Sequence, residues 1–231
     1  MTIKAVVFDA YGTLFDVYSI GALAEQLYPS QGAVIATLWR DKQIEYTRLT
    51  TMSDPHGATG SKYYQSFQDL TRLALQYTLE RLHLAPEPAN LDALMQQYQR
   101  LTPFPENMAV LEQLKAAGIQ CAILSNGNAE MLDSVVASAG MTHLLDHVIS
   151  VDSIRLFKTA PESYALVQQR IAVQKDEILF VSSNAWDALG ATWFGFQTLW
   201  INRQNLPFET IGPKPIYSGN NLKRVLEIVP V

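Results

Sequence analysis

The sequence predicts an α/β fold, with a Rossmann-like parallel-sheet core and an all-helical cap subdomain inserted after the first strand. Short continuous apolar runs alternate with helical patterns after about residue 105, which is typical of a parallel sheet covered on both faces. A similar apolar run, Ala5–Phe8, lies near the start of the chain. Between this run and the others, from about residue 16 to 100, all the patterns are helical.

Proline and glycine clusters divide the helical region. Apolar residues recur at turn-like spacing from Ile20 to about Met52, interrupted at Pro29–Gly32, and a loop follows at residues 53–61. Two further helices are expected at about 62–84 and 91–101, and Pro103–Pro105 reads as a stiff linker. We therefore expect a core formed by residues 1–15 and 101–231 and a cap formed by residues 16–100.

The remainder of the core alternates helices and strands. The expected strands are 120–124, 147–151, 178–181 and 198–201, and the expected helices are 107–117, 130–139, 161–171, 185–194 and 220–228. Polar residues that are candidates for the site follow the first four of the five strands. They are Asp9, Ser125–Asn126, Asp152 and Ser182–Asn184. Because ligands of open parallel sheets bind at the carboxyl ends of the strands, this edge is the predicted site, and the cap can serve as its lid.

Asp9 is the leading candidate for a functional group. A carboxylate at the end of an apolar strand is costly unless the site uses it. Most such residues cap helices or form turns, but no helical pattern begins at Ala10.

Composition excludes several classes of protein. The net charge is −5 with no run of Lys or Arg, which argues against nucleic-acid binding. The single Cys121 excludes an internal disulfide and a cysteine-based zinc site. No membrane-length apolar run and no signal-like start occur, so we expect a soluble cytoplasmic protein without membrane partners.

These motifs resemble the haloacid dehalogenase superfamily, and more narrowly the L-2-haloacid dehalogenases. The matching features are Asp9 with Thr13 (D-x-Y-G-T-L), Ser125-Asn126, Lys158 and the run from Ser182 to Asp187. Phe180 to Arg203 is the sharpest part, and Leu38–Arg40 and Gln43–Tyr46 also fit. The resemblance covers essentially the whole chain.

Tyr11 separates this chain from the phosphatases of the superfamily. Such a phosphatase carries a second Asp two residues after the nucleophile, where this chain has Tyr11. The fourth motif offers Ser182, Ser183 and Asn184 before its one acid, and magnesium prefers carboxylate oxygens. We therefore expect no metal and no cofactor, and a phosphoryl transfer without a metal would lose its charge clamp.

The resemblance implies that Asp9 attacks C2 of a short 2-halocarboxylate, which forms an ester and inverts C2. It implies that Lys158 keeps Asp9 ionised, that Thr13 hydrogen-bonds it, and that Asn184 and Asp187 orient Lys158 and the hydrolytic water. Ser182 and Tyr164 match further catalytic positions.

The resemblance also assigns substrate contacts. It places the halide on Arg40 and Asn126, and the substrate carboxylate on Ser125 and the amides of Ala10 and Tyr11. The expected apolar walls are Tyr11, Ile44, Phe67 and Trp186. Relatives are commonly dimers through the cap helices, and the apolar face of residues 62–84 allows a homodimer.

Two residues depart from the family pattern, and three alternative functions remain open. Thr159 stands where the family usually has Pro, and Asp41 stands where relatives often have a neutral amide; we expect Asp41 to point outward. The alternatives are a magnesium-dependent phosphatase, a metal-free hydrolase that opens a strained 2-carboxylated ring, and an inactive binding protein.

Overall fold

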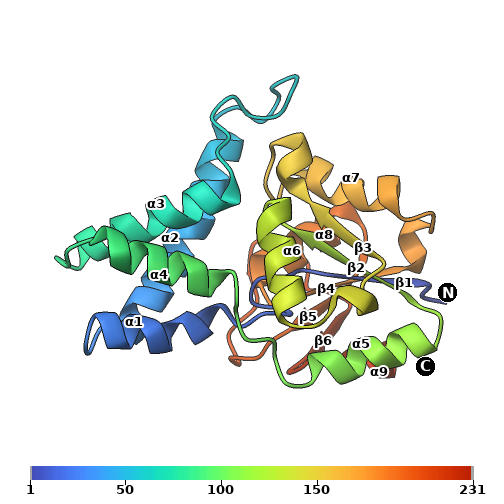
Figure 1. The fold of residues 1–231 in the computed structure, drawn as a ribbon. Coiled ribbons are helices and arrows are strands. Elements are labelled where there is room, and N and C mark those ends of the chain that lie inside the picture. Colours follow the sequence, from blue (N-terminus) through green and yellow to red (C-terminus); the bar gives the residue numbers. More distant parts are fainter. Residues whose placement is uncertain (1, 230–231) are drawn as a thin grey trace.

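The computed structural model describes residues 2–229 and contains one six-stranded sheet with helices around it (Figure 1). All the strand pairs are parallel, in the order β3-β2-β1-β4-β5-β6. The strands are β1 (Ala5–Phe8), β2 (Gln120–Ser125), β3 (His147–Ser150), β4 (Ile178–Ser182), β5 (Gln197–Ile201) and β6 (Tyr217–Gly219). The predicted fold class is thereby confirmed.

Strand β1 lies at the centre of the sheet. Phe8 pairs with Ile123 of β2 on one side and with Val181 of β4 on the other. All four residues of β1 are buried, which explains why the strand reads as a continuous apolar run. The strand order runs outward in opposite directions on the two sides of β1, through β2 and β3 on one side and through β4, β5 and β6 on the other. A ligand-binding crevice is expected at such a point, at the carboxyl end of β1.

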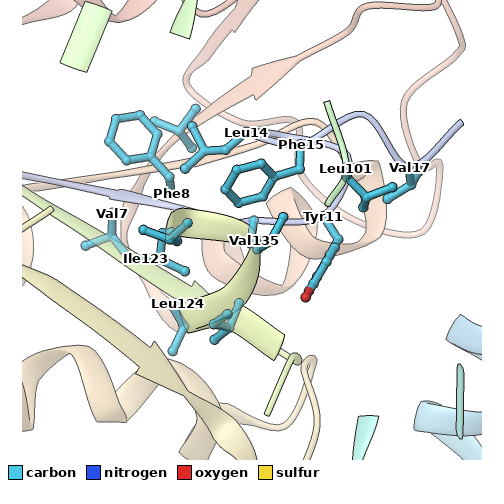
Figure 2. Packing of buried hydrophobic residues seen from close by; sticks show 14 of the residues in the cluster. Val7, Phe8, Tyr11, Leu14, Phe15, Val17, Leu101, Ile123, Leu124 and Val135 are labelled. Atoms are coloured by element: carbon cyan, nitrogen blue, oxygen red, sulfur yellow. The ribbon is translucent and has the colours of Figure 1, made fainter. Parts of the chain in front are cut away.

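The hydrophobic core surrounds this strand. Figure 2 shows Val7 and Phe8 beside Ile123, with Leu14 and Phe15 from the segment after β1 packed next to them. This packing holds the residues that follow β1 in a fixed position.

Helices connect the strands of the core. They are α5 (Asn107–Ala116), α6 (Ala129–Ser138), α7 (Pro161–Arg170), α8 (Ala185–Phe194) and α9 (Arg224–Ile228). Helix α8 packs on β4 and β5, and α6 packs on β3. Helix α8 begins directly after the polar residues that end β4, so these residues are held between two regular elements.

All the regular elements between β1 and α5 are helices, and they lie to one side of the sheet (Figure 1). Its helices are α1 (Gly21–Leu27), α2 (Gly32–Met52), α3 (Phe67–Arg81) and α4 (Pro88–Tyr98), after a 3-10 turn at Val17–Ile20. Helices α2 and α3 pack together, and the Trp39 indole donates to the Thr71 carbonyl over 2.7 Å. The Asp16 amide donates to Thr102 O over 2.8 Å, which joins the point where the chain enters the helical segment to the point where it leaves it.

Three helices begin at other residues than predicted, and one strand was not predicted. Helix α3 begins at Phe67, not near residue 62, because Ser66 caps it by accepting from the Asp69 amide. Helix α4 begins at Pro88, a residue suited to the first helical turn. The sequence analysis missed β6, and α9 begins only at Arg224.

No helix within residues 2–229 combines the length and the apolar character that crossing a membrane requires.

Candidate active site

The site begins at the carboxyl end of β1. Gly12 has a φ of +96°, a conformation that favours glycine, and the amides of Thr13 and Leu14 donate back to the Ala10 carbonyl. This turn places the Thr13 hydroxyl 3.0 Å from Asp9 Oδ2, to which it donates. Asp9 is 5% exposed, so its carboxylate depends on such contacts.

Lys158 lies between two carboxylates. Its Nζ is 3.0 Å from Asp9 Oδ1 and 3.0 Å from Asp187 Oδ2, and its side chain is fully buried. Burial opposes the ammonium form, but the charges of Asp187 and Asp9 outweigh it and raise the pKa of Lys158. The lysine is therefore charged, and it lies against Asp9, where the family resemblance placed it.

Asp187 links this ion pair to Tyr164. The Tyr164 hydroxyl donates to Asp187 Oδ1 over 2.8 Å. Burial raises the pKa of Asp187, against the opposing effect of Lys158, and it also raises that of Tyr164 well above its usual value. Gly190 makes the contact possible, because a Cβ there would lie 2.4 Å from the Tyr164 hydroxyl oxygen.

The loop after β4 closes over Asp9. Asn184 Nδ2 donates to Asp9 Oδ2 over 2.8 Å and to Tyr11 O over 3.0 Å. Asn184 thus contacts Asp9 directly, whereas the sequence analysis placed it on Lys158. Ser182 Oγ accepts from the Asn184 amide, and the Ser183 amide donates to Thr13 Oγ1. The structure therefore gives Ser182 a supporting contact within this loop.

The end of β2 supplies Ser125 and Asn126. Ser125 Oγ accepts from the Gly127 amide over 3.1 Å, and Asn126 Oδ1 accepts from the Lys158 amide over 2.9 Å. Asn126 Nδ2 is buried and has no partner within residues 2–229. Among the described residues, the backbone amides of Ala10 and Tyr11, at the end of β1, also have no acceptor. These donors remain available for an anion.

Arg40 reaches the site from α2. Its Nη2 donates to Tyr11 O over 3.0 Å and to Asn184 Oδ1 over 3.2 Å. The side chain is largely buried, at 9% exposure for the whole residue, so Arg40 is not an ordinary surface arginine. A cationic group from the helical segment therefore lies beside the carboxylate of the core.

A cavity of about 890 Å³ opens beside Arg40 and Asn184. Ile44 and Trp186 line it. Asp41 is solvent-exposed but also lines this cavity, so it does not point away from the pocket as expected. Phe67 does not line it but packs against the Tyr11 ring, at 5.5 Å between centroids. Tyr11 also contacts Tyr98 at 5.4 Å, so its ring is held from two sides.

The donor set does not suit a divalent cation. Within residues 2–229 no group of three or more His, Cys, Asp or Glu side chains is placed to hold one. The two carboxylates that do approach each other, Asp9 and Asp187, both bind the Lys158 ammonium.

Comparisons with known proteins agree with this geometry. A family model described as haloacid dehalogenase-like hydrolase matches residues 3–195. The (S)-2-haloacid dehalogenase H-109 of Pseudomonas putida is 43% identical over 213 residues, which cover 92% of each chain. The (S)-2-haloacid dehalogenase of Xanthobacter autotrophicus is 47% identical over 201 residues, 87% of this chain and 76% of that protein.

The chain belongs to the L-2-haloacid dehalogenase family.

The solved structure of the L-2-haloacid dehalogenase RSc1362 supports the assignment over the full length. It has 49% sequence identity and a TM-score of 0.95, and the match covers 100% of both chains. The haloacid dehalogenase resemblance stated from the sequence is thereby confirmed. The chain is a hydrolase of this family, and the phosphatase alternative is not favoured.

Three residues that support the site were not predicted from the sequence. Gln43 accepts a hydrogen bond from Arg40, Tyr98 donates one to Gln43, and Gly190 leaves room for the Tyr164 hydroxyl. Gln43 lies inside a stretch that matches the family, which was the available signal. Tyr98 and Gly190 occupy ordinary helix positions, so only the packing of distant helices identifies them.

Proposed function

We propose that this enzyme hydrolyses short (S)-2-haloalkanoic acids to (R)-2-hydroxyalkanoic acids through an ester on Asp9. One observation carries the proposal. The Asp9 carboxylate is fixed by Thr13, Lys158 and Asn184, and a buried guanidinium lies beside it. A fixed carboxylate next to a cation suits displacement of an anionic leaving group from carbon.

The first step forms the ester. An Asp9 carboxylate oxygen bonds to C2, the carbon–halogen bond breaks, and the halide leaves with the bonding electrons. Attack opposite the leaving group inverts C2. Arg40 and Asn126 Nδ2 provide donors for the halide, because a developing anion in a dry site needs fixed donors.

The second step returns Asp9. Water adds to the Asp9 carbonyl carbon, the bond between that carbon and the ester oxygen breaks, and the product keeps this oxygen as its hydroxyl. One proton of the water goes to this hydroxyl and the other is released; Asp187, whose pKa is raised by burial, would accept the released proton.

The substrate carboxylate has its own donors. Ser125 and the Ala10 and Tyr11 amides lie at the carboxyl ends of two adjacent strands and fit an anion there. Ile44 and Trp186 line the cavity and would contact the apolar part of a short haloacid, whereas Tyr11 and Phe67, which pack against each other outside that lining, would support the wall. A relative from Xanthobacter autotrophicus, 39% identical over 99% of this chain with a TM-score of 0.89, has been solved with chloropropionic acid covalently bound, which supports an ester intermediate.

A stereochemical assay tests this function. Chloride release is measured from (S)- and (R)-2-chloropropionate with EDTA present, and the lactate is resolved by chiral chromatography. We expect chloride only from the (S) acid, (R)-lactate as product, and no activity in Asp9→Asn. Phosphate release from aryl phosphates that EDTA abolishes, without chloride release, would contradict the proposal. Lack of chloride from every short 2-haloacid would favour ring opening or a binding role.

We also propose a division into a core of residues 1–15 and 101–231 and a cap of residues 16–100, and a homodimer through the cap. Leu49, Met52, Leu73 and Tyr77 of α2 and α3 are exposed, and the same helices carry a second, shallow cavity. Sedimentation of Leu73→Glu should show a monomer where the unchanged protein shows a dimer; a monomeric unchanged protein would contradict this.

A cytoplasmic location without nucleic-acid or membrane partners stays a prediction.

A further inference from the structure

Arg40 is held by a polar network inside the helical segment. Its Nη1 donates to Gln43 Oε1 over 2.7 Å, while Nη2 faces Tyr11 and Asn184 of the core. Tyr98 also donates to Gln43 Oε1, over 3.2 Å. One half of the guanidinium is therefore fixed from the cap and the other half faces the reacting groups.

The orientation of the Gln43 amide follows from its partners. Arginine can only donate, so Gln43 must present its carbonyl oxygen to Arg40. Gln43 Nε2 donates to Thr71 Oγ1 over 2.6 Å, and the Thr71 hydroxyl in turn donates to Phe67 O over 2.6 Å. The chain of donors runs in one direction, which excludes a flipped amide.

The network joins three helices and excludes water. Gln43 comes from α2, Thr71 from α3 and Tyr98 from α4. Gln43 is 1% exposed, Thr71 is fully buried and Tyr98 is 3% exposed. Buried networks with all members paired hold one geometry, and loss of one member leaves another unpaired.

Gln43 is also neutral. A carboxylate at this position would bind Arg40 equally well but would cancel its charge and compete with an anion. An amide fixes the guanidinium and leaves its full positive charge for the ligand.

We propose that Gln43 is a positioning residue that holds Arg40 for the departing halide, with Thr71 and Tyr98 as its supports. This inference rests on the proposed halide role of Arg40. Within residues 2–229, the Gln43 side chain makes hydrogen bonds to Arg40, Thr71 and Tyr98 but to neither Asp9 nor any other residue of the core. Its effect is transmitted through the placement and the undiminished charge of one guanidinium.

The expected signature is a change in leaving-group dependence. Chloride leaves less readily than bromide and needs more stabilisation from Arg40. In Gln43→Met, we expect the ratio of kcat/KM for 2-bromopropionate to that for 2-chloropropionate to rise about tenfold, the range of one hydrogen bond to a charged group. Inhibition by added bromide ion should weaken by a similar factor. Gln43→Glu should weaken bromide inhibition at least as much, although it keeps the hydrogen bond to Arg40.

Thr71 and Thr78 offer a matched pair on α3. Both are fully buried and donate to a carbonyl four residues earlier, but only Thr71 receives the Gln43 amide. Thr71→Val should shift the bromide-to-chloride ratio in the same direction as Gln43→Met, and Thr78→Val should leave the ratio unchanged. If all three variants lower activity and thermal midpoint together at an unchanged ratio, the residues are only structural and the proposal fails.

Arg40→Lys separates this proposal from the function it rests on. If Arg40→Lys keeps normal bromide inhibition and leaving-group ratio, the halide role of Arg40 is wrong. If Arg40→Lys loses bromide inhibition while Gln43→Met and Gln43→Glu keep it, the halide role stands and the positioning role of Gln43 is overturned.

Discussion

At the residue scale, the site depends on one buried ammonium between two buried carboxylates. A buried ion pair contributes little net stability when complete, because desolvation offsets the attraction. Its value here is orientation, since Lys158 holds Asp9 Oδ1 while Thr13 and Asn184 hold Oδ2. With both oxygens held, the nucleophile has one orientation.

Lys158→Met removes the cation but keeps the length of the side chain. We expect the free energy of unfolding to fall by roughly 3–5 kcal/mol, because two buried carboxylates lose their shared partner. Haloacid hydrolysis should fall to background. Urea unfolding and chloride release measure the two effects, with exposed Lys214→Met as the control. A variant with near-normal turnover would show that Lys158 does not orient the nucleophile.

Tyr164→Phe tests the role of Asp187. Burial raises the pKa of Asp187, and the hydrogen bond from Tyr164 lowers it. Because the raised pKa belongs to the folded state, Asp187 takes up a proton at a higher pH than an ordinary aspartate as the solution is acidified. Removing the hydroxyl raises the pKa further, so the acid limb of kcat should move to higher pH.

The pH profile of Tyr28→Phe is the control, because the Tyr28 hydroxyl donates to Ala85 O within the helical segment and makes no hydrogen bond to Asp187. An acid limb that stays in place or moves to lower pH in Tyr164→Phe would mean that a different group governs it.

The strand-end residues could be predicted from the sequence because parallel strands end at one edge of the sheet, and because no helical pattern at Ala10 gives Asp9 a capping role. Asp9, Lys158 and Asp187 meet as expected. Gln43 and Tyr98 could not be given a role, because each is an ordinary helix residue until α2 and α4 pack together. The hydrogen bond between them spans 55 positions.

At the element scale, the loop between α2 and α3 fastens the helical segment to the core. The Tyr64 hydroxyl donates to Asp152, which follows β3, and its ring stacks on Phe157 at 5.0 Å between centroids. The Ser61 amide donates to Arg155 O over 3.1 Å. Phe157 directly precedes Lys158, so this contact lies next to the catalytic groups.

Tyr64→Phe removes the hydroxyl and keeps the ring. We expect severalfold faster amide hydrogen exchange in residues 60–66, unchanged exchange in the central strands, and a higher KM for 2-chloropropionate, because a looser cap closes less often on the substrate. Tyr63→Phe is the matched control, since the neighbouring Tyr63 is 51% exposed. Equal exchange rates in the two variants would show that the Asp152 contact does not hold the loop.

The same loop explains the main error in element prediction. Tyr63, Phe67 and Leu70 fit a helical period, so the sequence predicted a helix from residue 62. Tyr64 instead packs across the interface on Phe157, and Ser66 starts the helix. Strand β6 was missed because Tyr-Ser-Gly has no apolar run, and its pairing with β5 alone defines it.

At the scale of the whole molecule, the fold brings three things to a single edge of the sheet: the Asp9 carboxylate, the Lys158 ammonium and the helical segment that carries Arg40. The strand alternation could be predicted, whereas the order of the strands depends on contacts between distant segments. Placing β1 between β2 and β4 brings Ser125, Asp9 and Ser182 together at that edge.

The central claim is that Asp9 carries the covalent intermediate. The most direct measurement is a single turnover of excess enzyme with (S)-2-chloropropionate in ¹⁸O-water, followed by mass spectrometry of the peptide that contains Asp9 and of the lactate. Hydrolysis of an Asp9 ester predicts one ¹⁸O in the Asp9 carboxylate and an unlabelled lactate hydroxyl. Label in the lactate hydroxyl with an unlabelled Asp9 peptide would mean direct attack by water and would contradict this account.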